Sequence, residues 1–208
     1  AGNGISISGA GGLLSDSIGL GIYVNAGLTA TGGDIVIKGQ SYNYGIIMRT
    51  AQTITAANGS VYIAGSSIVP ASSIYTNHGI EFDAGYRIIA NNNIDLVGFV
   101  GANATTAYGA MNAIGKNGVY NNLLVAKTGY ITLSGGTYQG SVTTTKTAGG
   151  IAISGLAAKS AGAFTIQGAV LDSDLWAVPA SGTSANTIGN MNAVNIGNYA
   201  VTVTGTTY

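Results

Sequence analysis

The sequence contains no cysteine and only two prolines among its 208 residues. Without cysteine, no disulfide can stabilise the fold, and neither a thiolate nucleophile nor a thiolate metal ligand is available. The fold must therefore be held together by backbone hydrogen bonds and by buried apolar side chains. The lack of disulfides is compatible with a bacterial surface protein.

Charge is also scarce. Charged residues make up 7% of the chain, and seven basic residues balance seven acidic ones. So few lysines and arginines offer little to a phosphate backbone, which argues against a nucleic-acid partner. No apolar run approaches the roughly 18 residues of a transmembrane helix, and no basic or apolar leader opens the sequence. Because the chain begins with Ala1 rather than Met, we expect a processed or excised piece.

The chain is rich in glycine, with 34 residues, and 46% of its residues are hydrophobic, enough to form a core. The glycines follow no collagen period. Instead, one short motif occurs seven times. In it, apolar residues alternate with other residues, and the last residue is glycine. Its copies span 4–9, 34–39, 60–65, 93–98, 130–135, 163–168 and 200–205. The closing glycines are 26 to 37 residues apart, which is the period of a solenoid.

Two further strand motifs follow each copy. A glycine followed by apolar–x–apolar occurs at 21–24, 45–48, 79–82, 118–121 and 150–153, and at 193–196 with alanine in place of glycine. A weaker segment follows at 28–30, 53–56, 87–90, 123–126 and 156–159. Three strands per repeat predict a right-handed parallel β-helix, because parallel crossovers strongly favour the right hand. We expect one all-β domain over 1–208, exclusively parallel, with six three-strand turns and one further strand, as a segment or protomer of a longer rod.

Alternation along each strand predicts which residues face the interior. In the first strand of each turn, these are the columns that begin at Ile5 and Ile7. In the second strand, they are the columns that begin at Ile22 and Val24. Asn121 is the one polar member of these columns, which indicates either a buried asparagine or a slip of register in the fourth turn.

Length variation is concentrated between the first and second strands of each turn. Insertions on one face of a solenoid often mark its binding side. The longest loops are predicted at 99–117, which holds Tyr108, and at 169–191. The second loop holds Asp172, Asp174 and the only tryptophan, Trp176. These four residues are candidate binding residues.

Reactive side chains are few: the chain has one histidine, one glutamate and six aspartates. A single histidine, His78, specifies no Ser/His/Asp triad, and its place before a strand favours a solvated loop. Asp172 and Asp174 could ligate calcium, but two carboxylates on a polar loop are more often solvated. We predict no catalytic residue, no cofactor and no metal site.

One charged group stands out. Aligned turns place Arg49 beside Asp83, both facing outward, with Glu81 nearby and Asp95 on a neighbouring first strand. Carboxylates with a basic residue would suit the sugar-acid site of a β-helical polysaccharide lyase. Because the carboxylate pair already has a cation beside it, we favour a structural ion pair between Arg49 and Asp83, worth at most about 1 kcal/mol if exposed.

Tyrosine is abundant, with 12 residues. Tyr23 and Tyr120 are predicted in one outward column of the second strand, and Tyr62 faces outward on the first. Phenol rings stack on sugars and fill protein interfaces, although they are also common in any strand. Tyr23 and Tyr120 therefore join the candidate binding residues.

The turns at 21–37 and 45–65 resemble the repeats of filamentous haemagglutinin-like adhesins, in the style of Gly-Ile-x-apolar followed by Asn-Gly-Ser-Val-Tyr-Ile-Ala-Gly. The likeness covers nearly the whole chain. The chain departs from the family pattern in its length and in the irregular loops of its fourth and sixth turns. It implies a right-handed β-helix on the bacterial surface, exported by two-partner secretion or as an autotransporter passenger. It also implies roles in adhesion, aggregation and biofilm, and no enzyme activity.

The predicted function is an extracellular structural or adhesive β-helix, a segment or subunit of a surface fibre. Its expected partners are more of the same chain or a second copy head to tail, and glycans of a host or cell surface. A β-helical carbohydrate-active enzyme or carbohydrate-binding module is the alternative. An ice-binding solenoid would need a regular threonine array, but Asp95 and Tyr62 interrupt the column that contains Thr132.

Overall fold

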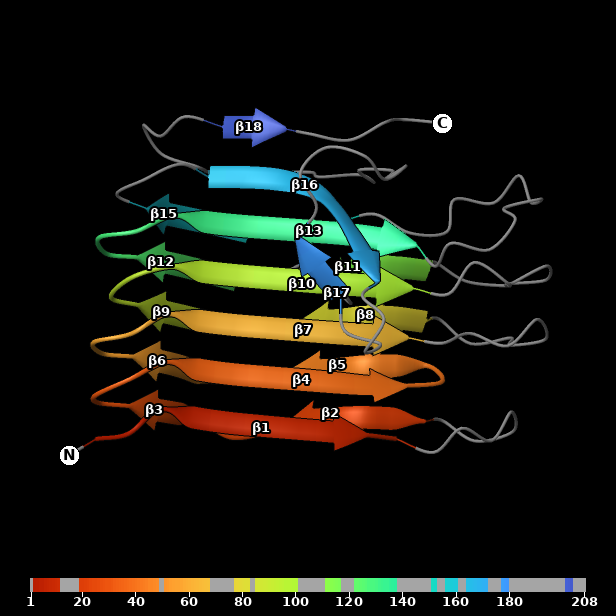
Figure 1. Cartoon of the computed structure of the whole chain (residues 1–208), viewed down its shortest axis with the longest axis horizontal. Coiled ribbons are helices and arrows are strands. Elements are labelled where there is room, and N and C mark those ends of the chain that lie inside the picture. The colour runs from red at the N-terminus through yellow and green to blue at the C-terminus, as the bar shows by residue number, and fades with distance from the viewer. Residues whose placement is uncertain are drawn as a thin grey trace.

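The computed structural model describes residues 2–11, 19–48, 51–67, 77–82, 85–100, 111–116, 122–137, 151–152, 156–160, 164–171, 177–179 and 201–203. These residues form 18 β-strands and contain no helix. Up to β15, every third strand belongs to the same sheet, which gives three sheets of parallel strands (Figure 1). Three consecutive strands, one from each sheet, form one layer of the stack.

The three sheets are defined by their strands. The first contains β1 (Ile5–Ala10), β4 (Ile35–Ser41), β7 (Val61–Ser67), β10 (Ile94–Val100), β13 (Ile131–Thr137), β16 (Phe164–Leu171), β17 (Ala177–Pro179) and β18 (Val201–Val203). The second contains β2 (Leu20–Val24), β5 (Tyr44–Met48), β8 (Asn77–Phe82), β11 (Met111–Lys116) and β14 (Ile151–Ala152). The third contains β3 (Leu28–Ala30), β6 (Thr53–Ala56), β9 (Arg87–Ala90), β12 (Asn122–Ala126) and β15 (Leu156–Ser160).

The predicted register of the first sheet is confirmed. The seven motifs pair in parallel through the column Ile5, Ile35, Val61, Ile94, Ile131, Phe164 and Val201. From Ile35 to Ile131, the members of this column are 0% exposed. Burying each such side chain contributes about 1.5–3 kcal/mol before conformational entropy is subtracted. This column is therefore one wall of the core.

The other two sheets complete the core. Ile46 and Ile80 of the second sheet are fully buried, as predicted. In the third sheet, an aliphatic column and an alanine column face the same interior. They consist of Ile54, Ile88 and Leu124, and of Ala30, Ala56, Ala90 and Ala126. In the first layer, Ile5, Ile22 and Leu28 are only partly buried, because they pack on the core from one side.

The fourth turn corrects the sequence prediction. Its second strand is β11, and the pairing of Ile114 with both Ile80 and Ile151 places it in the column predicted for the segment 118–121. Asn121 therefore reflects a slip of register, and it lies outside the described residues, as does Tyr120. The motif was missed because Lys116 stands where the other turns have an apolar residue, and because Gly118 and Val119 offer a competing match. The predicted loop 99–117 consequently contains the end of β10 and all of β11.

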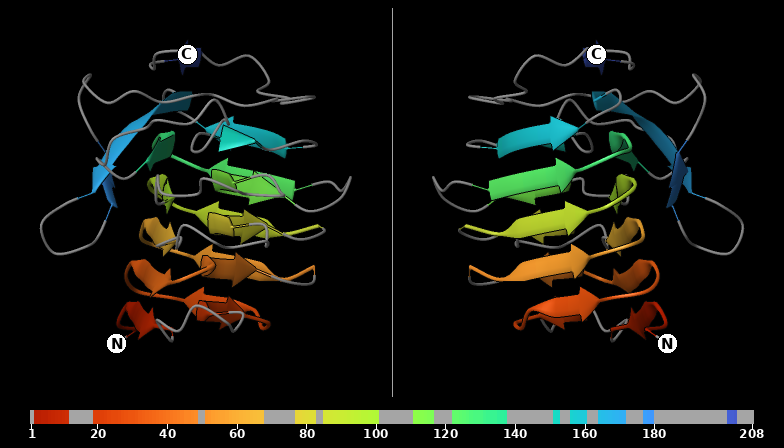
Figure 2. Two further views of the ribbon diagram at one scale, coloured as in Figure 1. Left: turned by 90° about the vertical axis from the view of Figure 1, so that its right-hand side faces the viewer. Right: turned by 90° about the vertical axis from the view of Figure 1, so that its left-hand side faces the viewer.

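The sixth turn also departs from expectation. β16 runs through Leu171 and pairs antiparallel with β17, so the strands are not exclusively parallel and the predicted loop 169–191 is partly strand. β17 contacts β7, β10 and β13, and it lies against the outer side of the first sheet (Figure 2). Ala64 and Val97, which face that side, are at most 1% exposed. Five complete three-strand layers are described, and the predicted strand at 193–196 lies outside the described residues.

The closing glycines mark a corner where two sheets meet backbone to backbone. A Cβ on Gly9 would lie 2.6 Å from the carbonyl oxygen of Gly21. On Gly39, a Cβ would collide with the carbonyl oxygen of Gly45 and lie 2.6 Å from Cγ1 of Ile46. No side chain fits at such distances. Glycine is therefore needed one or two residues before the first strand ends, and a Cβ on Gly45, near the start of the second strand, would collide with the backbone nitrogen of Ser66.

The opposite corner, between the third and first sheets, is held by short polar side chains. The N–H of Ser60 donates to Oδ1 of Asp34 at 2.7 Å, and the N–H of Asn93 donates to Oγ of Ser60 at 3.3 Å. The N–H of Tyr130 then donates to Oδ1 of Asn93 at 3.2 Å. One side-chain acceptor per layer thus satisfies a backbone donor of the next layer, and we call these residues the corner ladder.

Candidate functional site

Most candidate site residues predicted from the sequence lie outside the described residues. These are Trp176, Asp172, Asp174, Tyr108, Tyr120, Arg49 and Asp83. The proposed Arg49–Asp83 ion pair is thus untested, although the strand register beside it is confirmed by the pairing of Met48 with Phe82. Tyr23 is described, and its side chain is 48% exposed on β2.

His78 was expected in a solvated loop, and this prediction is wrong. His78 belongs to β8 and is 5% exposed. Its Nε2 lies 3.9 Å from Oε2 of Glu81, which is 2% exposed. The prediction failed because β8 begins two residues before the glycine of its motif. At this distance, the two side chains form an ion pair only when the imidazole is protonated.

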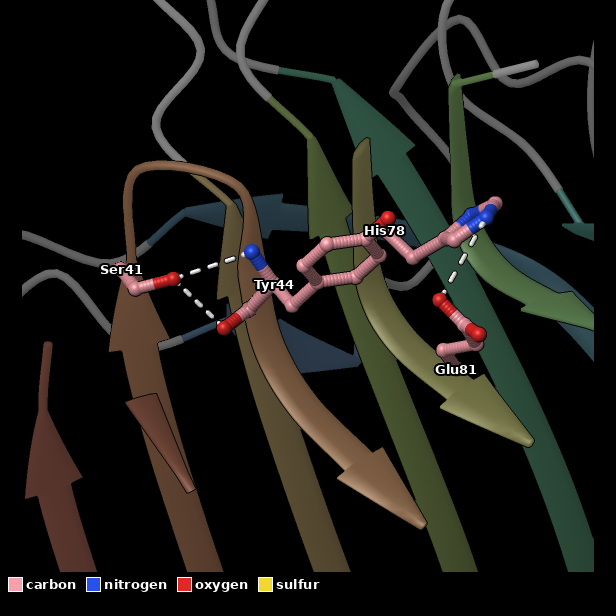
Figure 3. A network of polar contacts seen from close by, with 4 residues as sticks. All are labelled: Ser41, Tyr44, His78 and Glu81. Atoms are coloured by element: carbon pink, nitrogen blue, oxygen red, sulfur yellow. Dashed lines mark hydrogen bonds and ion pairs between the residues drawn. The ribbon is translucent and has the colours of Figure 1, made fainter. Parts of the chain in front are cut away.

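A small polar network leads from this pair to the layer below (Figure 3). The ring of Tyr44 points toward His78, with their centroids 5.9 Å apart. Ser41 organises the turn before Tyr44. Its Oγ accepts a 3.0 Å hydrogen bond from the N–H of Tyr44 and lies 2.8 Å from the carbonyl oxygen of Gly19. The network therefore connects three successive layers at the loop-bearing corner.

The titratable pair of this network is buried. His78 and Glu81 are closed to solvent, so an external substrate would have to displace protein to reach them. Asp95, which the sequence grouped with Glu81, lies on β10 in a different sheet. The structure therefore does not bring these two carboxylates together. Over the described part of the chain, no group of three or more His, Cys, Asp or Glu side chains could hold a metal ion.

A second polar group lies on the outer side of the first sheet. Tyr62, Asp95 and Thr132 occupy one outward column on β7, β10 and β13, as predicted. Lys38 of β4 places its Nζ 5.8 Å from the centroid of the Tyr62 ring. Tyr130, just before β13, is 42% exposed. We call Tyr62, Asp95, Tyr130 and Thr132 the Asp95 patch.

The electrostatics of the patch centre on the Asp95 carboxylate. Burial disfavours its ionised form and raises its pKa, while a side-chain hydrogen bond with Thr132 opposes that shift. The pKa of Tyr130 is also raised, first by burial and then by the charge of Asp95. The phenol and the carboxylate are therefore within electrostatic reach of each other. The sequence placed Asp95 outward but gave no sign that Tyr130 would approach it.

The chain matches no family model, no curated protein and no solved structure. The described residues include no helix long and apolar enough to cross a membrane.

Proposed function

We propose that the chain is a right-handed parallel β-helix that acts as a structural and adhesive element of an extracellular or bacterial surface fibre. One observation carries this proposal: the same columns recur in register through successive layers of three parallel sheets. Such an arrangement produces length and a repeated surface, and each layer depends mainly on its neighbours. The resemblance of residues 21–37 and 45–65 to filamentous haemagglutinin-like repeats supports the same conclusion.

We also propose that the chain is not an enzyme. Its only glutamate and only histidine are Glu81 and His78, and both are buried at the corner network. A β-helical lyase or hydrolase would need several accessible carboxylates near a base. Near the first sheet, the described residues offer two accessible carboxylates, the partly accessible Asp95 and the exposed Asp34 of the corner ladder, and no base is described beside them.

Axial association is the expected mode of assembly. Among the described residues, β1 pairs only with β4. The N–H groups of Ile5 and Gly11 point toward β4, where they donate to the carbonyl oxygens of Asp34 and Gln40. By the alternation of a parallel ladder, the N–H of Ser8 faces the free edge. That edge suits another parallel strand, from the same polypeptide or from a second copy head to tail.

Small-angle scattering and negative-stain microscopy of the purified chain test this proposal. We expect particles that lengthen along one axis as concentration rises, because copies add to the end of the stack. Ser8→Pro should block the lengthening, because proline removes the donor at the free edge and no ladder bond to β4. Ser8→Ala is the matched control. A monodisperse monomer at high concentration would refute axial assembly.

A further inference from the structure

We propose that the Asp95 patch binds a neutral glycan, with the Asp95 carboxylate accepting sugar hydroxyl groups between the rings of Tyr62 and Tyr130. This inference rests on the adhesive function proposed above and gives that function a ligand class. It places the ligand on the outer side of the first sheet rather than on the loops at the corner.

The carboxylate has acceptor positions to spare. An ionised carboxylate can accept about four hydrogen bonds. Thr132, which is 7% exposed, makes a side-chain hydrogen bond with Asp95 from the next layer. The remaining acceptor positions on the outward side can take hydroxyl donors from a ligand. Because the group is partly desolvated, such hydrogen bonds would be stronger than at a fully hydrated carboxylate.

The two tyrosines flank this acceptor along the stack. Tyr62 pairs directly with Asp95 from the layer below. Tyr130 precedes Ile131, which pairs with Ile94 in the layer of Asp95. Adjacent strands are about 4.8 Å apart, close to the length of one pyranose unit. Tyr130 lies two positions before Thr132, which pairs with Asp95, so it is diagonal to the carboxylate. A glycan that crosses the layers obliquely would therefore meet Tyr62, Asp95 and Tyr130 in turn, with its C–H faces on the rings.

Charge favours a neutral ligand over the two charged alternatives. Asp95 would repel an acidic sugar. A cationic peptide would be drawn to the carboxylate, but the Lys38 ammonium already lies near the Tyr62 ring, where it opposes a second cation. A polyhydroxylated neutral chain can use the carboxylate, the phenol groups and the ring faces at once.

The hairpin of β16 and β17 limits the patch on one side. β17 contacts β7, β10 and β13 on the outer side of the sheet, where the next outward column is buried at Ala64 and Val97 (Figure 2). Tyr62 and Asp95 lie nearer the start of their strands and remain partly accessible. A ligand can therefore occupy a strip between the hairpin and the corner ladder, parallel to the stack.

Titration calorimetry with the full chain tests the inference. The probes are soluble neutral oligosaccharides built from β-linked glucose, mannose or N-acetylglucosamine, with an oligogalacturonate and a lysine-rich peptide as charged comparisons. We expect at least one neutral oligosaccharide to bind. Asp95→Asn should weaken it by about tenfold or more, the effect of losing hydrogen bonds to a charged acceptor. Tyr130→Ala should also weaken it.

Leu20→Ala is the control, because Leu20 is also exposed, at 36%, but belongs to the second sheet. Binding that survives both Asp95→Asn and Tyr130→Ala would overturn the inference. So would binding of only the peptide or the acidic sugar, or no binding to any neutral oligosaccharide. In each of these cases, an assembly that lengthens with concentration in scattering would leave the proposed structural function standing. This readout distinguishes failure of the glycan site from failure of the structural function.

Discussion

The backbone N–H of Ser60 donates a 2.7 Å hydrogen bond to Oδ1 of Asp34 in the layer below, and this contact is repeated at the same corner in the next two layers. The corner ladder shows how a chain without disulfides stabilises turns between sheets. Each short side chain accepts a hydrogen bond from one backbone N–H that makes no bond in the parallel ladder. Asparagine, aspartate and serine suit this role because their acceptors lie close to the backbone.

Replacing Asn93 with alanine should therefore lower the free energy of unfolding by about 1 kcal/mol, because the N–H of Tyr130 loses its acceptor. Urea unfolding monitored by circular dichroism measures the effect. Asn93→Asp is the control, since it retains an oxygen at the same position. Equal losses in the two variants would show that the hydrogen bond is not the cause.

Replacing Gly65 with alanine should be far more damaging. Its Cβ would collide with the carbonyl oxygen of Gly79 and lie 2.7 Å from Cγ1 of Ile80. We expect a loss of about 1–3 kcal/mol or a failure to fold, as for other overpacked sites. Gly27→Ala is the control, because its Cβ would lie 3.2 Å from the nearest atom, the carbonyl oxygen of Thr53. A Gly65→Ala protein as stable as Gly27→Ala would contradict the close approach of the two sheets.

Much of this fold was predictable because side-chain alternation and glycine position recur in most turns. Alternation alone placed Ile94 and Ile131 in one buried column, and the structure confirms it. The same pattern failed in the fourth turn, where Lys116 replaces the second apolar residue of the motif and Gly118 begins a competing match. It also could not reveal the β16–β17 hairpin, since alternation is the same whether a strand pairs in parallel or antiparallel.

The site was less predictable than the fold. The sequence gave the column that contains Tyr62, Asp95 and Thr132, because register follows from aligned motifs. It did not give the burial of Glu81, which faces outward yet is 2% exposed. Nor did it give the approach of Tyr130 to Asp95. Both depend on how separate layers pack in space, which no local spacing encodes.

The burial of Tyr86 predicts how the stability of the fold changes at alkaline pH. It is 1% exposed, and its ring packs edge-on against Phe82 at 6.2 Å. Burial raises its pKa well above the ordinary value of 10.0. Below that value, the phenol is protonated in both states and contributes no pH dependence. Above it, the unfolded chain releases the proton first, so stability falls by up to about 1.4 kcal/mol per pH unit.

Tyr86→Phe should therefore show a shallower loss of stability above pH 10.0, whatever its stability at neutral pH. Urea midpoints at a series of alkaline pH values measure the slope. An unchanged slope in the variant would assign the alkaline loss to other groups.

The partly buried carboxylate of Asp95 lowers the stability of the fold, so its removal is expected to be stabilising. Below its ordinary value of 3.8, the carboxyl group is protonated in both states. As pH rises above that value, the unfolded chain ionises more readily than the folded one, whose pKa is raised by burial. Stability is therefore lost through this window, and the loss persists at neutral pH.

Asp95→Asn should accordingly raise the Tm at neutral pH, with a gain that shrinks as the pH falls toward about 3. The amide oxygen can still accept from Thr132. Thr132→Val should act in the opposite direction, because it removes the hydrogen bond that lowers the pKa of Asp95. Thermal unfolding across this pH range measures both variants, and an Asp95→Asn protein that is less stable at every pH would refute the argument. A carboxylate that lowers the stability of the fold at neutral pH is typical of a binding site. The same Asp95→Asn variant should therefore be both more stable and a weaker binder of neutral oligosaccharides.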